Sequence, residues 1–192
     1  MEELKSFDEI HERDPRHHNF VVPAENFRKI SLIDIYNDVA DIKLHEGVPE
    51  KIRSHFEMAR NLLVYSWFFY PFHMAAWLYA LISVEYALRE RIGKNKMKFK
   101  HMLKRAVKEK WIKVEGFSHI QTKIKNIKEL GEEYFGPIEG DMFKNYCDSL
   151  CESIPLFRNE MAHGSTMLFT ATSHQVRICS EFINQLFEEP LK

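Results

Sequence analysis

Residues 143–165 read FKNYCDSLCESIPLFRNEMAHGS, and the spacing of their apolar side chains decides the fold class. These side chains recur at i, i+3, i+4, i+7, i+8 and i+11, the period of one helix face, and they are Phe143, Tyr146, Cys147, Leu150, Cys151 and Ile154. Gly164 follows the last helical residue, as is typical of a helix end. The pattern predicts an amphipathic helix over residues 141–163, and we expect Pro155 to kink it.

The same helical period recurs on both sides of this stretch, along most of the chain. We therefore predict an all-α fold, a helical bundle of five or six helices. The other helices are expected at about 50–69, 72–92, within 89–113, and at 119–130 and 173–188. A loop with some extended character is expected at 111–114. The bundle would span residues 49–190. Residues 1–48 would form an irregular N-terminal arm, partly packed, whose first 22 residues, with His17 and His18, are loose and solvated.

Composition narrows the class of protein. Hydrophobic residues make up 45% of the 192 and include 15 Phe, so the chain is not disordered. The three cysteines fall on helical stretches without a Cys-x-x-Cys pair, and we interpret them as small core residues in a reducing compartment, without metal or cofactor. The polar start argues against a signal peptide and for a cytoplasmic protein.

Residues 61–84 lack Asp, Glu, Lys and Arg and are numerous enough to cross a bilayer. Pro71 and His73 lie in the middle of this stretch, and its aromatic residues cluster centrally rather than in two interfacial belts. The sequence therefore predicts the end of one helix and the start of another, and no membrane span.

Charge is distributed unevenly. Residues 89–113 contain eleven Lys or Arg against two Glu, although the whole chain has a net charge of −1. Such a block suits a phosphate backbone, and it equally fits a solvated helix face. For the first alternative, the residues expected to contact RNA are Lys98, Lys100, Lys104, Arg105 and Lys108.

Arg158, Asn159 and His163 bring a planar cation, an amide and an imidazole to one helix end. Histidine exchanges protons near neutral pH and arginine matches phosphate oxygens, so the group suits a phosphodiester. Arg158 and His163 are about 140° apart around an ideal helix, so they converge only if the helix end frays or a second copy contributes. The alternative is structural: a salt-bridged arginine, and a histidine at the negative end of the helix dipole. Arg13 and His18 repeat the spacing in the arm, where Pro15 rules out a helix interior.

Glu85 lies within the apolar stripe of the helix expected at 72–92, so its carboxylate needs a partner. Arg89, four residues later, is the local choice. A catalytic Arg or His on another helix is the second choice, and the sequence leaves both open.

Two stretches make the chain resemble the HEPN superfamily over about residues 50–188. Residues 156–165, LFRNEMAHGS, are similar to the family's Arg, polar residue, three residues, His signature. Residues 80–91, ALISVEYALRER, are similar to the early helix that often reads Ala-x-Glu-x-x-Leu-Arg in that family. The order of early helix, basic middle, signature helix and closing helix is also similar.

The resemblance implies a homodimer in which two signature helices meet at a cleft, and a metal-independent endoribonuclease of a toxin–antitoxin, antiviral or RNA-processing system. In that reading His163 moves a proton during attack of a ribose 2′-OH on phosphate, and Arg158 stabilises the added charge. Asn159 orients His163 or the phosphate, and Glu85 faces the site from the early helix. An antitoxin protein would be a partner.

The family also contains members in which the signature is a non-catalytic nucleotide-binding or protein-interaction site, and this alternative stays open. Some HEPN toxins carry a tyrosine, two or three residues after the histidine, that a nucleotidyltransferase modifies. Ser165 and Thr166 stand there in this chain, so we do not expect that mode of control.

Overall fold

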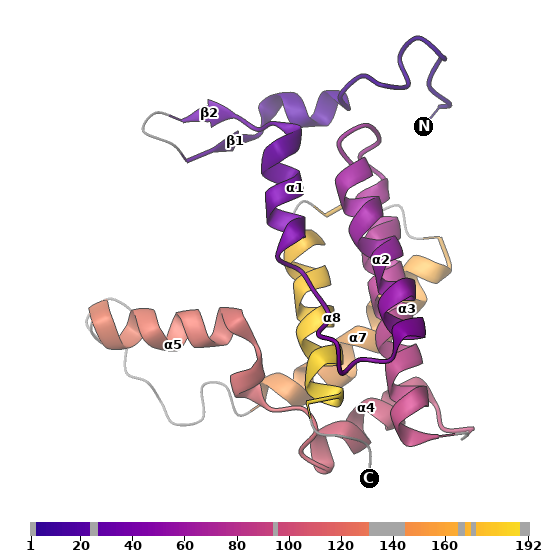
Figure 1. The fold of residues 1–192 in the computed structure, drawn as a ribbon, viewed down its shortest axis with the longest axis vertical. Coiled ribbons are helices and arrows are strands. Elements are labelled where there is room, and N and C mark those ends of the chain that lie inside the picture. The colour runs from indigo at the N-terminus through magenta and orange to yellow at the C-terminus, as the bar shows by residue number, and fades with distance from the viewer. Residues whose placement is uncertain are drawn as a thin grey trace.

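The computed structural model describes residues 3–23, 27–93, 96–130, 145–164, 168–169 and 172–188, and it confirms the all-α fold (Figure 1). The described elements, in chain order, are η1 (Pro15–Asn19), β1 (Val21–Val22), β2 (Arg28–Lys29), α1 (Leu32–Ala40), α2 (Glu50–Tyr65), α3 (Phe72–Ile92), α4 (Phe99–Lys108), η2 (Val114–Gly116), α5 (Ser118–Leu130), α7 (Tyr146–Ala162) and α8 (Thr172–Leu186). The two strands form one short antiparallel pair in the N-terminal arm.

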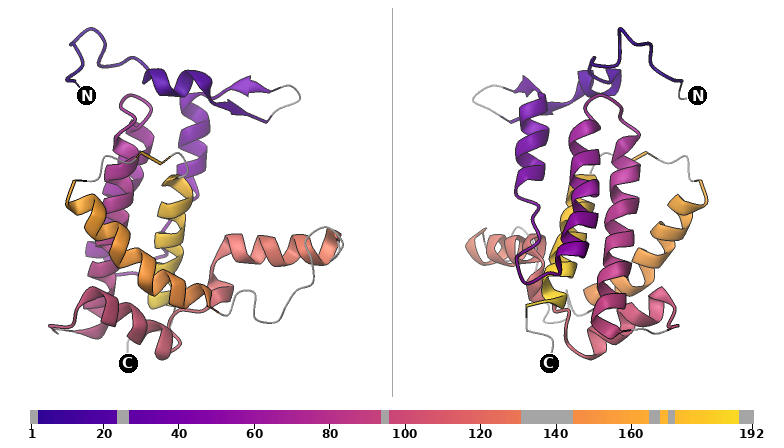
Figure 2. Two further views of the ribbon diagram at one scale, coloured as in Figure 1. Left: turned by 180° about the vertical axis from the view of Figure 1, so that it is seen from behind. Right: turned by 45° about the vertical axis from the view of Figure 1, so that its right-hand side comes forward.

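Helix α3 lies at the centre of the bundle and contacts α2, α8, α7 and α4. Helices α2 and α8 run beside it, α7 crosses it obliquely, and α5 projects sideways (Figure 2). Because α3 has neighbours on several sides, it is apolar around most of its circumference. Its buried side chains include Ala76, Trp77, Ala80, Leu81, Val84, Ala87 and Leu88.

All three cysteines lie in this core, as predicted. Cys147, Cys151 and Cys179 are buried and unbridged. Burial raises the pKa of Cys147 and Cys151 to about 11 and that of Cys179 to about 12, so each remains a neutral thiol at neutral pH. They act as small apolar residues of α7 and α8.

Several expected boundaries shift. Helix α2 ends at Tyr65 instead of residue 69, and a tighter turn follows, in which the Trp67 N–H donates to the Val64 carbonyl. The arm binds this turn, because the Asp14 N–H donates to the Trp67 carbonyl at 2.8 Å. In the loop after α4, Lys113 has extended dihedral angles, and the 3₁₀ turn η2 follows at Val114–Gly116. The Lys113 N–H donates to the Gln185 amide oxygen at 2.7 Å. Helix α7 continues through Pro155, and residues 141–144 of the predicted helix lie outside the described part.

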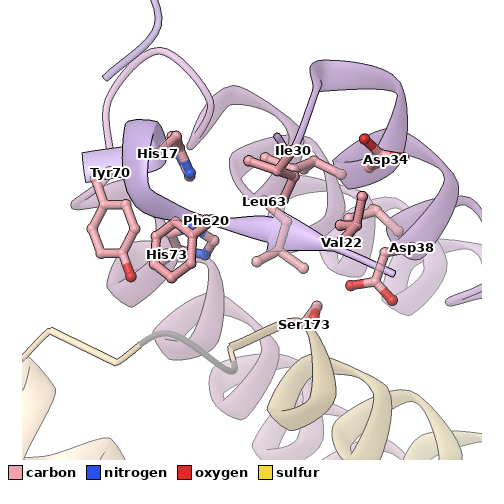
Figure 3. Close-up of a pocket in the computed structure, with 12 residues that line it drawn as sticks. His17, Phe20, Val22, Ile30, Asp34, Asp38, Leu63, Tyr70, His73 and Ser173 are labelled. Carbon is pink, nitrogen blue, oxygen red and sulfur yellow. The ribbon is translucent and has the colours of Figure 1, made fainter. Parts of the chain in front are cut away.

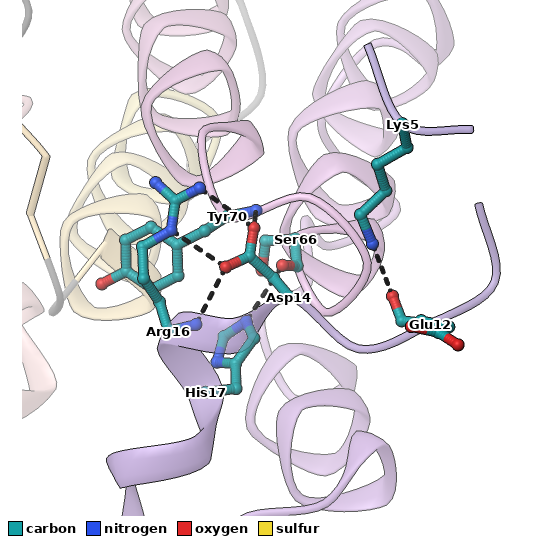
Figure 4. Close-up of polar contacts among 7 residues, drawn as sticks. All are labelled: Lys5, Glu12, Asp14, Arg16, His17, Ser66 and Tyr70. Carbon is teal, nitrogen blue, oxygen red and sulfur yellow. Dashed lines mark hydrogen bonds and ion pairs between the residues drawn. The ribbon is translucent and has the colours of Figure 1, made fainter. Parts of the chain in front are cut away.

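The expectation that the first 22 residues are solvated is wrong for Asp14 and His17. The arm lies across the α2–α3 turn and covers a cavity (Figure 3). Asp14 and His17 are both buried, with 2% of their surface exposed. Asp14 accepts hydrogen bonds from Arg16 and from the Tyr70 backbone N–H, and His17 Nε2 lies 3.0 Å from the Ser66 carbonyl oxygen (Figure 4). Pro15 occupies the first turn of η1, where a missing N–H costs nothing.

No helix in the described ranges is long and apolar enough to cross a membrane. The uncharged stretch 61–84 is divided, as predicted, between the end of α2 and the first part of α3, with Pro71 directly before α3.

We expect Asp14→Asn to weaken the arm in a pH-dependent way. Burial by itself would raise the pKa of Asp14, but hydrogen bonds from Arg16 and the Tyr70 backbone outweigh it and hold the pKa below its ordinary value. The charged carboxylate therefore stabilises the fold above that value, and the contribution is lost as pH falls below it. At pH 7 the variant should lose about 1–3 kcal/mol of unfolding free energy. Denaturant melts should show this gap narrowing toward pH 3, and a gap constant with pH would contradict the assignment.

We expect Gly116→Ala to destabilise the contact between η2 and α8. A Cβ at Gly116 would lie 2.1 Å from Gln185 Cδ, and Gln185 is held in place by its bond from Lys113. The clash should cost about 1–3 kcal/mol in a denaturant melt. Glu115→Ala, at the exposed neighbouring position, is the control and should stay close to wild type.

Candidate functional site

The signature residues lie in the last turns of α7, and the helix holds its geometry to its end. Helix α7 runs to Ala162, His163 is its C-cap, and Gly164 follows with φ +93°. This positive φ is the left-handed conformation that glycine adopts most readily, as the predicted helix end requires. The His163 N–H donates to the Asn159 carbonyl at 2.9 Å, so the end of the helix does not fray.

Arg158 faces α3, where Glu85 binds it. Arg158 Nη2 lies 3.3 Å from Glu85 Oε2, and Arg89 Nη2 lies 2.7 Å from Glu85 Oε1. Both partners that the sequence allowed for Glu85 are therefore present together. Glu85 is only 14% exposed and forms ion pairs with two guanidinium groups. One carboxylate neutralises one of the two positive charges, so one positive charge remains.

Asn159 fixes the Arg158 guanidinium from the other side. Arg158 Nη1 donates to Asn159 Oδ1 at 3.3 Å, and Arg158 remains 35% exposed. Its Nε is buried without a hydrogen-bond partner in the described part of the chain. A half-exposed arginine with a fixed plane and spare N–H groups suits an incoming phosphate.

His163 stays apart from this group. Its side chain is exposed, and its imidazole makes no hydrogen bond or ion pair with any described residue. It follows Asn159 by four residues and so continues the same side of the helix. The structure therefore brings Glu85, Arg158 and Asn159 together. His163 lies apart from them, exposed at the end of α7.

A surface groove of about 810 Å³ runs between α4 and α7 and includes Asn159 in its lining. Lys100 and Lys104 line it from α4, and Glu152 and Leu156 line it from α7. Both lysines form ion pairs with Glu152, and the Lys104 Nζ–Glu152 Oε1 distance is 3.0 Å. Hydrogen bonds from the two lysines hold the pKa of Glu152 below its ordinary value. Asp148 also lines the groove, so its charged side chains are two lysines and two carboxylates.

The other three predicted RNA-binding residues are not in the lining of this groove. Lys98 precedes α4 and Lys108 ends it, and both are exposed. Arg105 pairs with Glu109 at 3.7 Å and lies 5.7 Å from the centre of the Trp111 ring, so it anchors the following loop. The five predicted RNA-binding residues therefore divide into two groove lysines, two other exposed lysines and Arg105, which contacts Glu109 and Trp111.

Glu152 is the site residue that sequence reasoning missed. It stands seven residues before Asn159, close to two helical turns, so helical phase alone places both on one side of α7. What the phase does not reveal is that α4 packs against that side. Within the described ranges no group of three or more His, Cys, Asp or Glu is arranged to hold a metal ion.

We expect Glu85→Gln to loosen the contact between α3 and α7. The amide keeps the size of the side chain but leaves Arg89 and Arg158 without their shared anion, which should cost about 1–3 kcal/mol of unfolding free energy. Glu57→Gln is the control, because Glu57 is 50% exposed and pairs only with Arg60 on its own helix. Denaturant melts should separate the two variants, and equal losses would mean that the shared carboxylate has no special role.

Comparison with family models, with curated proteins and with solved structures finds no match to this chain. The resemblance to the HEPN superfamily is therefore a prediction carried by the two quoted stretches.

Proposed function

We propose that this protein is a metal-independent endoribonuclease of the HEPN type, with Arg158 and His163 as its reacting groups. The observation that carries the proposal is the Arg158 guanidinium, half exposed, fixed between Glu85 and Asn159, and beside a groove lined by lysines. Such an arginine would bind a phosphate at the end of the groove, and this supports a strand of RNA that contacts both α7 and the basic helix α4.

The proposed reaction is an in-line transesterification. His163 takes the proton of a ribose 2′-OH, the 2′ oxygen forms a bond to the adjacent phosphorus, and the bond from phosphorus to the 5′ oxygen breaks. The leaving 5′ oxygen takes up a proton, so the products are a 2′,3′-cyclic phosphate and a 5′-OH. Arg158 stabilises the extra negative charge on the pentacovalent phosphorus.

The groove supports RNA binding because its ion pairs are easily exchanged. Lys100, Lys104 and Glu152 are all about half exposed, and ion pairs between exposed side chains contribute little to stability. A phosphate can therefore displace Glu152 from one lysine at small cost. The two groove lysines and the surplus positive charge at Glu85 would contact consecutive phosphates of one strand.

A second copy of the chain is part of the proposal. Arg158 faces α3 and His163 lies at the exposed helix end, so the two do not converge within one copy. In a homodimer whose α7 ends meet, His163 of one copy can approach the phosphate that Arg158 of the other copy holds. An RNA substrate agrees with a cytoplasmic protein, and an antitoxin protein that covers the groove would control it.

The proposal is tested by incubating purified full-length protein with mixed single-stranded and structured RNA in the presence of a chelator. Wild type should cleave and leave 2′,3′-cyclic phosphate ends. Arg158→Ala and His163→Ala should each lower the rate at least 100-fold, in the range typical of lost proton transfer or charge stabilisation.

Arg13→Ala and His18→Ala are the matched controls, because they remove the same residue pair at the same spacing from the arm. Both should leave cleavage unchanged. Full activity in His163→Ala would overturn the assignment of the base. Thermal melts of all variants distinguish a lost reaction from a lost fold.

The second candidate function is a non-catalytic module that binds a nucleotide or another phosphate-bearing partner. It is favoured by one observation: Arg158 already has a carboxylate partner, while His163 has no group in the described chain to orient it. This candidate predicts RNA binding that Arg158→Ala weakens and His163→Ala does not, with no cleavage by any of the proteins.

A further inference from the structure

A cavity of about 230 Å³ lies between the N-terminal arm and the bundle, on residues that the proposed ribonuclease site does not use (Figure 3). The arm contributes His17, Phe20, Val22 and Ile30, α1 contributes Asp34, Ile35, Asp38 and Val39, and the bundle contributes Leu63, Tyr70, His73 and Ser173. Segments far apart in the sequence therefore meet at one half-open space. Such a cavity is slightly smaller than the ~300 Å³ at which pockets for drug-sized ligands begin.

The walls are mostly apolar, with a few polar groups. Phe20 and Tyr70 stack in parallel, with ring centres 6.4 Å apart, and aliphatic side chains from the arm, α1 and α2 complete the lining. Ser173 lies at the start of α8, below the arm strand in the close-up (Figure 3). An apolar space with few polar groups is the usual composition of a small-molecule site.

His73 is the main polar group of the bundle wall. Its Nδ1 lies 2.6 Å from the Thr172 hydroxyl oxygen, which leaves Nε2 without a partner in the described chain. Burial, with a smaller effect of the nearby His17, lowers the pKa of His73 to about 4, so the ring is neutral at pH 7. A neutral imidazole offers one hydrogen bond to a ligand and no charge.

The charged groups at the cavity are already paired. No lysine or arginine is among the described residues of the lining, so an anionic ligand would find no cation there. Asp34 bonds to both terminal nitrogens of Arg28, and Asp38 lies 3.8 Å from Arg177. Because the carboxylates have guanidinium partners, a cationic ligand would also gain little.

We propose that the cavity under the arm binds a small, uncharged, mainly aromatic or aliphatic molecule that carries a single hydrogen-bonding group. Its apolar body packs against Phe20, Leu63 and Val22, and its polar group bonds to His73 Nε2 or Ser173. The ligand bridges the arm and the bundle, so its binding stabilises the docked arm by mass action. The inference is independent of the ribonuclease proposal.

The test compares three probes of nearly the same size and different charge: benzyl alcohol, benzoate and benzylamine. Each is titrated into the full chain at pH 7, with the methyl resonances of Leu63 and Val39 followed by NMR. Benzyl alcohol should bind with saturation, because its hydroxyl both donates and accepts and so fits either tautomer of His73. Benzoate and benzylamine should bind at least tenfold more weakly.

Val22→Phe and Val21→Phe form a matched pair of variants. The two residues are neighbours in β1, so their side chains point to opposite faces. Val22 lines the cavity, and Val21 is 52% exposed and does not. Val22→Phe should fill the space and abolish benzyl alcohol binding, and Val21→Phe should leave it unchanged. Ser173→Leu fills the cavity from the α8 side and serves as a second blocking variant if Val22→Phe loosens the arm.

Each other outcome counts against the proposal. Absence of binding by all three probes would mean that the cavity is a packing defect. Equal binding of benzoate or benzylamine would overturn the neutral ligand class. Binding that survives both Val22→Phe and Ser173→Leu, in variants with wild-type melting curves, would place the probe elsewhere.

Discussion

The burial of α3 on several sides is the constraint on which the structure depends. A helix of this length that contacts α2, α4, α7 and α8 needs an apolar surface around most of its circumference, and α3 has one. The arm, the basic helix and the signature helix are all positioned against α3 or against the turn that precedes it.

The polar residues of α3 connect it to three different helices. His73 bonds to Thr172 at the start of α8, Ser83 bonds to His55 of α2, and Glu85 pairs with Arg158 of α7. Each polar group in a largely apolar helix requires a partner, so each fixes the register of one neighbour. The candidate functional site is the third of these contacts, at the point where the partner helix comes near the surface.

The two regions that we assign to ligands differ in charge for a structural reason. At Glu85 one carboxylate meets two guanidinium groups, which leaves positive charge for a phosphate, and two lysines that can exchange their carboxylate partner line the adjacent groove. Under the arm, Asp34 and Asp38 each lie next to a guanidinium group, and His73 is neutral. The cavity therefore suits an uncharged molecule. Both properties arise where separate elements pack together.

Local pattern determined the helical class, the position of α3 from Phe72 to Ile92, the glycine that ends α7 and the burial of the cysteines, because helical period and glycine conformation act within a few residues. The helical period also predicts that Arg158 lies on the inward face of α7 and that His163 lies off that face. Only the tertiary structure decided that Asp14 binds the turn after α2, that Glu85 holds two arginines and that Glu152 holds two lysines. These contacts join residues up to 73 positions apart in the sequence. Which residues meet depends on how the helices pack, and a local sequence pattern carries no information about that packing.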